Sequence, residues 1–321
     1  PRDTLFHLQE KNVSVEDELA KFAPDKDSAL TIGVFDGVHL GHKQLISELT
    51  KQARQKNLLS GVVTFRQHPE GIISAEKKLP LLTDMPTRVS LLKDAGADFV
   101  VPLTFSNEMA NLSAKYFVAL LQKHLKMKAL VIGPDFALGK NREGNIELLT
   151  KLGQEMGFSV TAVPPLVSHG ETISSTVIRR TLAEGDMEKY RRLTGRYFSL
   201  KGKVVAGAGR GGGLGFPTAN LEVSRGHALP PDGVYCGIAH INGKTYQTMT
   251  NVGTNPTFGE NDRTIESFLL DYDGDLYGHA LSVDFISKLR DEKKFKSIDE
   301  LKKQVASDVK RGKEILSGKC V

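Results

Sequence analysis

The chain has 321 residues, 40% of them hydrophobic and 25% charged, which is typical of a globular protein with two domains. Its net charge of +5 suits anionic ligands, but the basic residues do not form the dense stripe of nucleic-acid-binding proteins. The two cysteines, Cys236 and Cys320, are too distant for a disulfide framework or zinc site. No apolar run approaches the roughly 18 residues of a membrane span, and residues 1–20 lack a signal-peptide core. We expect a cytoplasmic protein that binds neither nucleic acid nor membranes.

The first stretch that carries chemistry runs from residue 29 to residue 53, and it predicts a short apolar strand, a turn and a helix. Asp36-Gly37 marks the turn, and apolar residues recur at helical spacing after Lys43. His39 and His42 fall at the turn and the helix start, where backbone N–H groups lack intrahelical partners and the helix dipole is positive. Such a helix start binds phosphate.

This stretch resembles the His-x-Gly-His signature of the nucleotidyltransferase superfamily, whose members bring a nucleoside triphosphate to an acceptor. The resemblance implies that His39 and His42 donate hydrogen bonds to the triphosphate as charge builds up on it. The ATP-binding residues that it implies here are Gly33, Phe35, Asp36 and Gly41.

Residues 29–166 alternate apolar strands with helices. Further strands are expected at 61–65, 98–103, 129–133 and 158–163, and helices at 87–95, 113–126 and 146–156. This alternation predicts an α/β domain with a parallel sheet covered on both faces. Ligands bind outside the carboxyl ends of such strands, where Phe65, His68, Pro69 and Asp135 are found.

Another helix is expected to open at residues 173–180. Serine and threonine hydroxyls can cap it, and Arg179 lies one turn after Thr176, so both can face one phosphate. A capped helix with an exposed arginine is an equally good interpretation. Residues 183–196 predict a short helical linker, and we place the boundary between two domains, 1–186 and 187–321, within it.

After Phe198 the helices give way to short strands. Asn242-Gly243 predicts a hairpin between strands at 233–241 and 244–250, and Asp273-Gly274 separates strands at 265–271 and 281–286. Closely spaced short strands predict a small antiparallel barrel. A terminal helix is expected at about 297–313.

A glycine-rich stretch, residues 207–220, is the first candidate site of this half. Its glycines allow backbone amides to cradle phosphates, and Thr218 and Asn220 alternate along one strand, so both oxygens can reach one Mg²⁺ ion. Glycines at barrel corners and a turn proline are the structural alternative.

Glu266 is the second candidate, because it is a lone carboxylate in the apolar run Ile265–Leu270. Beside a hydroxyl acceptor it would act as a general base. Pairing with a basic neighbour is the simpler interpretation.

Together these stretches resemble the prokaryotic bifunctional riboflavin kinase/FMN adenylyltransferases, also called FAD synthetases, over nearly the whole chain. Beyond the histidine stretch, the similarity rests on motifs in the order Gly-x-Asp-Phe-x-x-Gly at 133–139, Ile-Ser-Ser-Thr-x-Ile-Arg at 173–179, Gly-Phe-Pro-Thr-Ala-Asn at 215–220, Asn-Val-Gly at 251–253, Asn-Pro-Thr-Phe at 255–258, Asp-Leu-Tyr-Gly at 275–278 and Arg-Asp-Glu-Lys-Lys-Phe at 290–295.

The resemblance implies a Rossmann-like adenylyltransferase domain followed by a riboflavin kinase barrel, with ATP as co-substrate, Mg²⁺ as cofactor, and riboflavin, FMN and FAD as substrates and products. In the adenylyltransferase, the resemblance implies that ATP is also bound by Ser175, Thr176 and Arg179, and the flavin by Phe65, His68, Pro69 and Asp135. In the kinase, it implies that ATP is bound by Gly207, Gly209, Gly215, Phe216 and Pro217, the flavin by Arg290, Glu292 and Phe295, and Mg²⁺ by Thr218 and Asn220. The chain departs from many relatives at Gln67, where they carry proline, and at Phe268, where they carry histidine.

The two implied reactions differ in what they require. Phosphorylation of riboflavin needs a base to deprotonate a primary alcohol, and Glu266 is the candidate. Adenylylation of FMN uses an ionised phosphate oxygen, so positioning and charge stabilisation suffice. A flavin- or nucleotide-binding regulator without turnover and a basic nucleic-acid-binding protein are the alternatives. Joint retention of His42, Asn220 and Glu266 disfavours the first, and the missing basic stripe disfavours the second.

Overall fold

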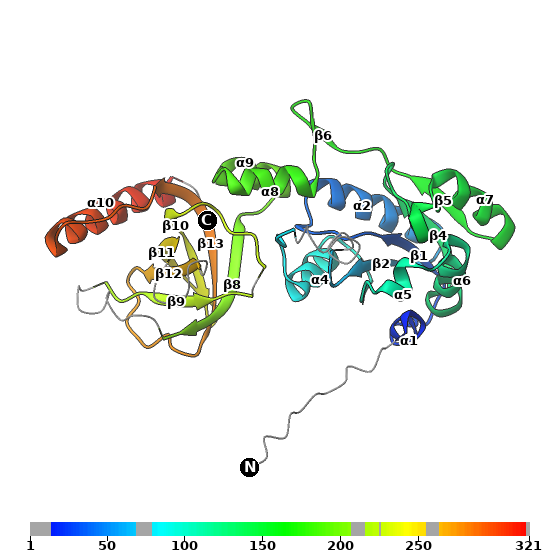
Figure 1. The fold of residues 1–321 in the computed structure, drawn as a ribbon, viewed down its shortest axis with the longest axis horizontal. Coiled ribbons are helices and arrows are strands. Elements are labelled where there is room, and N and C mark those ends of the chain that lie inside the picture. Colours follow the sequence, from blue (N-terminus) through cyan, green and yellow to red (C-terminus); the bar gives the residue numbers. More distant parts are fainter. Residues whose placement is uncertain (1–13, 69–78, 207–215, 225, 255–262, 319–321) are drawn as a thin grey trace, which may run out of the picture. The chain divides into compact units, whose positions relative to one another are not determined.

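The computed structural model describes residues 14–68, 79–206, 216–224, 226–254 and 263–318 (Figure 1). The chain divides into two compact units, the first made of Pro1–Leu79 with Met85–Leu166, and the second of Pro80–Asp84 with Val167–Val321. Each unit has its own sheet and its own hydrophobic core.

The first unit contains a five-stranded parallel sheet in the order β3-β2-β1-β4-β5. Its strands are β1 (Ser28–Ile32), β2 (Leu59–Phe65), β3 (Phe99–Leu103), β4 (Met127–Ile132) and β5 (Ser159–Ala162). The predicted parallel sheet is therefore confirmed, and every strand lies within two or three residues of its expected position.

Helices cover both faces of this sheet, as expected. They are α1 (Val15–Ala20), α2 (Leu40–Gln55), α4 (Met85–Asp94), α5 (Asn107–Ala110), α6 (Ala114–Leu125) and α7 (Ile146–Met156), with a 3-10 turn, η1 (Lys140–Arg142). Alternate residues of β1 enter two cores: Ala29 packs with Leu49 of α2, whereas Leu30 packs with Phe117 of α6. The strands can be covered by helices on both faces because the side chains on both of their faces are mostly apolar.

The second unit is a closed antiparallel barrel in the strand order β10-β11-β12-β9-β8-β13. The strands are β8 (Phe198–Val205), β9 (Ala219–Glu222), β10 (Gly233–Ile241), β11 (Lys244–Thr254), β12 (Arg263–Leu269) and β13 (Ala280–Arg290). The hairpin between β10 and β11 turns on Asn242 and Gly243, whose φ angles of +49° and +75° suit a two-residue turn. The expected barrel and this hairpin are confirmed.

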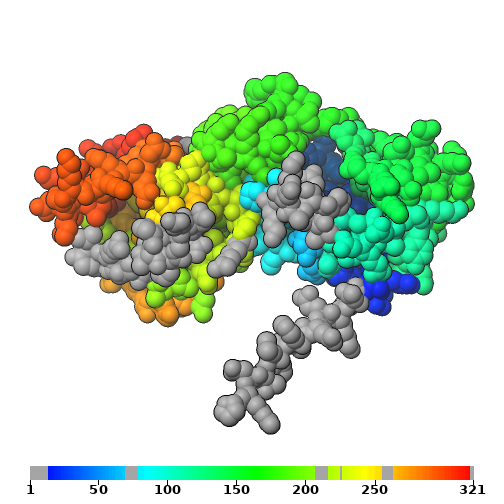
Figure 2. All heavy atoms as spheres, viewed as in Figure 1, coloured from blue at the N-terminus to red at the C-terminus, as the bar shows by residue number. Residues whose placement is uncertain are grey.

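Three helices and a small hairpin are the other elements of this unit among the residues that the structure describes. They are α8 (Ser175–Ala183), α9 (Met187–Thr194), α10 (Ile298–Ser317) and the strand pair β6 (Val167–Ser168) and β7 (Glu171–Thr172). In Figure 2 the orange and red spheres of the last part of the chain, which includes α10, lie against the rest of the barrel unit, and Leu316 of α10 joins an apolar cluster with Cys236, Met249 and Ile286. Cys236 is thus a core residue, as predicted.

The segment expected to be a linker is packed instead. Tyr190 of α9 is buried, and its ring makes an edge contact of 5.5 Å with Phe198 at the start of β8. By its contacts, the chain from Val167 onward, α8 included, belongs to the barrel unit. Within the described residues no helix has the length and hydropathy needed to cross a membrane.

Candidate active sites

His39 caps the helix that follows β1. It is the N-cap of α2, with extended backbone (φ −76°, ψ 174°), and its Nδ1 accepts a hydrogen bond from the His42 backbone N–H at 3.3 Å. Because Nδ1 accepts, the proton of the neutral ring is placed on Nε2. The sequence correctly predicted a helix start here, and the helix begins three residues earlier than the periodicity suggested.

The two histidines form one stacked pair. Their ring centroids are 3.6 Å apart with an interplanar angle of 18°, and Phe35 makes an edge contact of 5.1 Å with His42. Phe35 and His39 are almost entirely buried, whereas His42 is half-buried. Packing therefore fixes the orientation of both imidazoles relative to the first turn of α2.

The segment from the end of β1 to the first turn of α2 carries four further residues expected to bind ATP, of which Phe35 is described above. Gly33 follows the strand directly and donates its N–H to the Val63 carbonyl at 3.0 Å. Asp36 is only 1% exposed, and its Oδ1 accepts from Arg88 of α4 at 3.3 Å. Gly41 lies in the first turn of α2. Asp36 therefore lies below the surface of the loop, where its carboxylate meets an arginine.

A large cavity opens at the carboxyl ends of the parallel strands. It has a volume of about 910 Å³, and apolar and aromatic side chains line it, among them Phe65, Phe105 and Phe136. Phe65 and Phe105 contact each other edge to face at 5.5 Å. Gly33 and Asp135 also line it, so two of the expected flavin-binding residues, Phe65 and Asp135, are brought together beside the histidine loop. His68 is half-buried beyond the end of β2, and Pro69 lies outside the described residues.

Ser175, Thr176 and Arg179 lie on α8. Ser174 caps this helix by accepting from the Val177 N–H at 3.3 Å, as the hydroxyl-rich sequence predicted. Arg179 donates from Nε to the Pro80 carbonyl at 2.9 Å. It also lines a cavity of about 830 Å³ in the barrel unit, together with Asn220, His227 and Arg263.

Glu266 lies in a row of polar residues across three barrel strands. It stands directly opposite Asn220 of β9 on one side and Asn251 of β11 on the other. Directly opposed residues project from the same face of a sheet, and the flanking Ile265 and Ser267 are buried. The row therefore faces outward from the barrel, half-buried, with a carboxylate between two amides.

Thr218 lies just outside the strand on which it was expected. β9 begins at Ala219, directly after it, and Pro217 before it has no N–H with which to extend the ladder. Thr218 and Pro217 line a cavity of about 260 Å³ with Tyr272 and Tyr277, whereas Asn220 lines the larger one. Gly207, Gly209 and Gly215 lie outside the described residues.

Phe216 packs against Phe268 of β12. Its ring meets that of Phe268 edge to face, with centroids 5.4 Å apart. Phe268 lies two residues after Glu266 on the same face of β12, so the aromatic pair borders the polar row. Phe268 thus gives Glu266 an aromatic neighbour on the same face of β12, packed against Phe216.

Arg290, expected to bind flavin, is held at the end of β13. Its Nε donates to both carboxylate oxygens of Asp308 on α10, at 3.1 and 3.0 Å, and its guanidinium lies 5.6 Å from the Phe295 ring centroid. Glu292 lies close to Gly253, where an added Cβ would come within 2.6 Å of its Oε1. The segment after β13 is therefore folded back towards β11, and the absence of a side chain at Gly253 is what admits Glu292.

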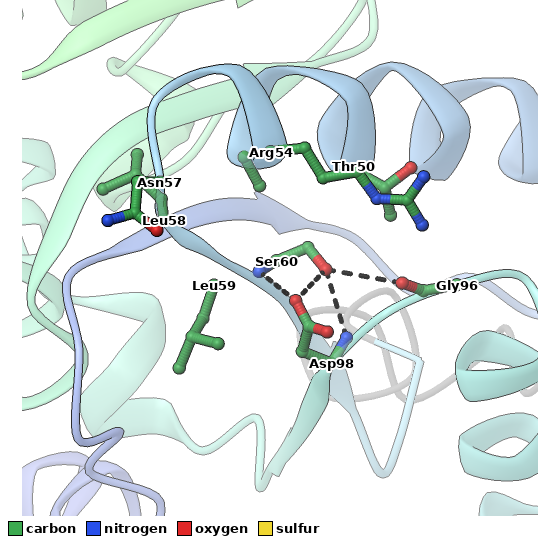
Figure 3. A pocket seen from close by; sticks show the side chains of 9 residues that line it. Thr50, Arg54, Asn57, Leu58, Leu59, Ser60, Gly96 and Asp98 are labelled. Carbon is green, nitrogen blue, oxygen red and sulfur yellow. Dashed lines mark hydrogen bonds between the residues drawn. The ribbon is translucent and has the colours of Figure 1, made fainter.

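One further cavity lies at the opposite, amino-terminal edge of the parallel sheet. It has a volume of about 320 Å³ and includes Arg54, Ser60 and Asp98 in its lining (Figure 3). Asp98 Oδ2 accepts from both the N–H and the Oγ of Ser60, each at 2.7 Å. Its carboxylate is thus used within the fold, remote in the sheet from the histidine loop.

Sequence reasoning missed several residues that organise these sites. Arg88 holds the histidine loop, Phe105 lines the large cavity, Asn251 completes the polar row and Asp308 anchors Arg290. The Asn-Val-Gly motif was a usable signal for Asn251. Arg88 gave none, because a basic residue in a short helix ordinarily indicates a solvent-exposed face.

The fold and its sites define a protein of two parts. One is a nucleotide-binding α/β unit with paired histidines at a helix start, and the other is a barrel unit with a carboxylate between two amide side chains. Two family models match the chain in the same order, FAD synthetase over residues 21–177 and riboflavin kinase over residues 194–316. The chain belongs to the bifunctional riboflavin kinase/FMN adenylyltransferase family.

Individual members of this family are similar to the chain over most of its length. The enzyme of this name from Escherichia coli (strain K12) is 38% identical over 89% of this chain and 92% of its own length. That from Bacillus subtilis (strain 168) is 33% identical over 94% and 95%. A crystal structure titled as a macrolide-efflux protein from Streptococcus pneumoniae is similar with a TM-score of 0.84 and 31% identity, covering 92% of this chain and 96% of that one. Riboflavin, FMN, FAD and ATP are therefore the substrates and products of this enzyme.

Proposed function

We propose that the adenylyltransferase reaction takes place at the histidine loop and the barrel phosphorylates riboflavin, with residues 1–186 and 187–321 as the functional domains. The observation that carries the first assignment is the stacked His39–His42 pair beside the 910 Å³ cavity. The gap between the two family models, residues 178–193, supports a boundary there.

In the adenylyltransferase reaction, FMN occupies the large cavity with its ring system against Phe65 and Phe105. A phosphate oxygen of FMN forms a bond to the α-phosphorus of ATP, the bond to the bridging oxygen breaks, and pyrophosphate leaves. His39 donates from Nε2 to the phosphates, because its Nδ1 is used in the cap. His42, Gly41 and the first N–H groups of α2 stabilise the accumulating charge. Ser175, Thr176 and Arg179 are assigned to ATP on the family resemblance.

In the kinase reaction, Glu266 accepts the proton of the riboflavin 5′-hydroxyl as its oxygen forms a bond to the γ-phosphorus of ATP, and ADP leaves. The half-buried position of Glu266 between Asn220 and Asn251 supports this role, since both amides can orient its carboxylate. Phe216 and Pro217 are assigned to ATP, with Gly207, Gly209 and Gly215. Arg290, Glu292 and Phe295 are assigned to the flavin.

Mg²⁺ is the remaining part of the kinase proposal. The donor chemistry fits it: the Asn220 amide lies opposite the Glu266 carboxylate, and the Thr218 hydroxyl lies two residues away, all hard oxygen donors. Thr218 and Asn220 would hold the ion. When bound, Mg²⁺ neutralises negative charge on the ATP phosphates. With two cysteines in the chain and ATP as substrate, we place both reactions in the cytoplasm.

His42→Ala tests the site assignment in the intact enzyme. Loss of one transition-state donor lowers a rate by about 10²–10³-fold, so formation of FAD from FMN should fall by that factor, while formation of FMN from riboflavin stays at the parental rate. Chromatography of both products from purified protein, ATP and MgCl₂ measures the two rates. An equal loss of both activities, or no loss of FAD formation, refutes the assignment of His42.

A further inference from the structure

The loop that leads from β1 to the histidine helix has an unusual backbone. Phe35, Gly37 and Val38 all have positive φ angles, of +51°, +80° and +33°. Glycine adopts such angles freely, but a phenylalanine and a β-branched valine do so only where their surroundings hold them. Something besides local preference must therefore fix this loop, and with it His39.

Arg88 of α4 makes the contacts that can hold it. Its side chain is 1% exposed, and its Nη1 donates to the Val34 carbonyl at 3.0 Å and to the Phe65 carbonyl at 2.9 Å. Its Nη2 donates to Asp36 at 3.3 Å. One guanidinium thus joins the ends of two parallel strands to the histidine loop.

Thr64 contributes a second contact to the same carbonyl. Its Oγ1 donates to Val34 at 2.9 Å, so the last residue before the strained segment accepts two hydrogen bonds. The planar, multidentate guanidinium suits three acceptors in fixed directions, which a single ammonium group does not. The site of these contacts is the carboxyl edge of the sheet, where the proposed reaction takes place.

Core packing alone does not explain this arrangement. Desolvation of two charges offsets most of their attraction, so a buried ion pair gives little net stability compared with apolar residues of similar size. Asp36 and Arg88 are each 1% exposed. Their directed contacts instead specify one conformation of the loop.

We propose that Arg88 is a positioning residue of the adenylyltransferase site. It acts through Val34 and Asp36, holding the loop in the conformation that places His39 and His42 against the triphosphate. The proposal rests on the assignment of these two histidines to catalysis. It assigns Arg88 no contact with substrate.

Arg88→Lys in the full-length enzyme is the test, because it keeps the positive charge and removes the planar guanidinium with its several N–H donors. A misplaced catalytic group costs on the order of 10²-fold in rate. We expect kcat for FAD formation from FMN to fall by about that factor with little change in KM, and the kinase rate to stay within two-fold of the parent. Arg54→Lys is the matched control: it is the same substitution in the same unit, at the exposed residue lining the amino-edge cavity of Figure 3, and should change neither rate.

Imidazole NMR separates positioning from general damage. The stacked rings shift each other's signals, and comparison with His39→Gln and His42→Gln spectra assigns them. In Arg88→Lys these signals should move towards those of unstacked histidine, while the other imidazole signals stay in place. Unchanged FAD formation, an equal loss of both activities, or a lost rate with unmoved His39 and His42 signals would overturn the proposal. If His42→Ala itself leaves FAD formation intact, it is the site assignment that fails.

Discussion

Glu266 of β12 and Asn220 of β9 lie directly opposite each other, on the same outward face of the barrel. Residues so placed have Cβ atoms roughly 4.5–5.5 Å apart. The proposed base and one proposed metal ligand of the kinase are therefore immediate neighbours, although 46 positions of sequence separate them. Changes at each should nevertheless have different kinetic signatures.

Glu266→Gln should selectively impair the kinase. The glutamine keeps the shape and hydrogen bonding of the side chain but cannot accept the hydroxyl proton, so riboflavin phosphorylation should slow by roughly 10²–10⁴-fold. Adenylylation of supplied FMN should continue at the parental rate. Initial rates from riboflavin and from FMN, on protein with an unchanged melting curve, measure this. A kinase rate within a few-fold of the parent would remove Glu266 from the chemistry.

Asn220→Ala should alter the magnesium dependence. Contacts to charged groups contribute about 1.5–3 kcal/mol, so the MgCl₂ concentration for half-maximal kinase rate should rise about tenfold or more. The kinase rate should recover substantially at high MgCl₂, unlike that of Glu266→Gln. Asn251→Ala is the matched control, since it removes the other amide beside Glu266 without touching the proposed ligand. An equal magnesium shift in both variants would contradict the assignment.

Two substitutions of His39 should separate its cap from its catalytic donor. Asparagine is a good N-cap and alanine a poor one, so His39→Ala should lose about 0.5–2 kcal/mol of stability and His39→Asn much less. Neither variant keeps an Nε2 donor, so both should form FAD about 10²–10³-fold more slowly. Denaturant unfolding and FMN adenylylation measure the two effects. Near-parental adenylylation in His39→Asn would show that the cap alone matters.

The two domains should work as separate fragments. Residues 1–186 should convert FMN to FAD, and residues 187–321 should convert riboflavin to FMN. The division by contacts places α8 with the barrel unit, so a second fragment, 1–166, is the informative comparison. It lacks Ser175, Thr176 and Arg179 and should not form FAD. If 1–186 folds by circular dichroism yet forms no FAD, the sites are not autonomous.

Local signals in the sequence predicted much of the fold and part of the sites. Ser113 was a recognisable N-cap, and it accepts from the Tyr116 N–H as expected. Apolar runs located the parallel strands because such strands are buried on both sides. The His-x-Gly-His stretch located the turn and helix start because cap and phosphate chemistry act over a few residues.

Contacts between distant segments were out of reach. Arg88 binds a loop more than fifty positions away, and nothing near it in sequence records those partners. Strand β8 was missed because its residues alternate between buried and exposed, unlike the apolar runs used to find strands. Asn220 and Glu266 were each singled out, but only the register of the barrel made them neighbours.

The two sheets differ in how their borders are exposed to other chains. Each described barrel strand pairs on both sides, β13 closing the ring between β8 and β10. Within the part of the chain that the structure describes, the parallel sheet instead ends at β3 and β5, and open borders of this kind recruit strands from unfolded neighbours. The Leu103 carbonyl accepts a hydrogen bond from the Arg66 N–H, so the backbone polar groups of Leu103 face β2 and those of the preceding Pro102 face the open side of β3. Proline has no N–H, so this position cannot donate a hydrogen bond to an added strand. Heat aggregation should thus begin in the α/β unit, at β5 rather than β3.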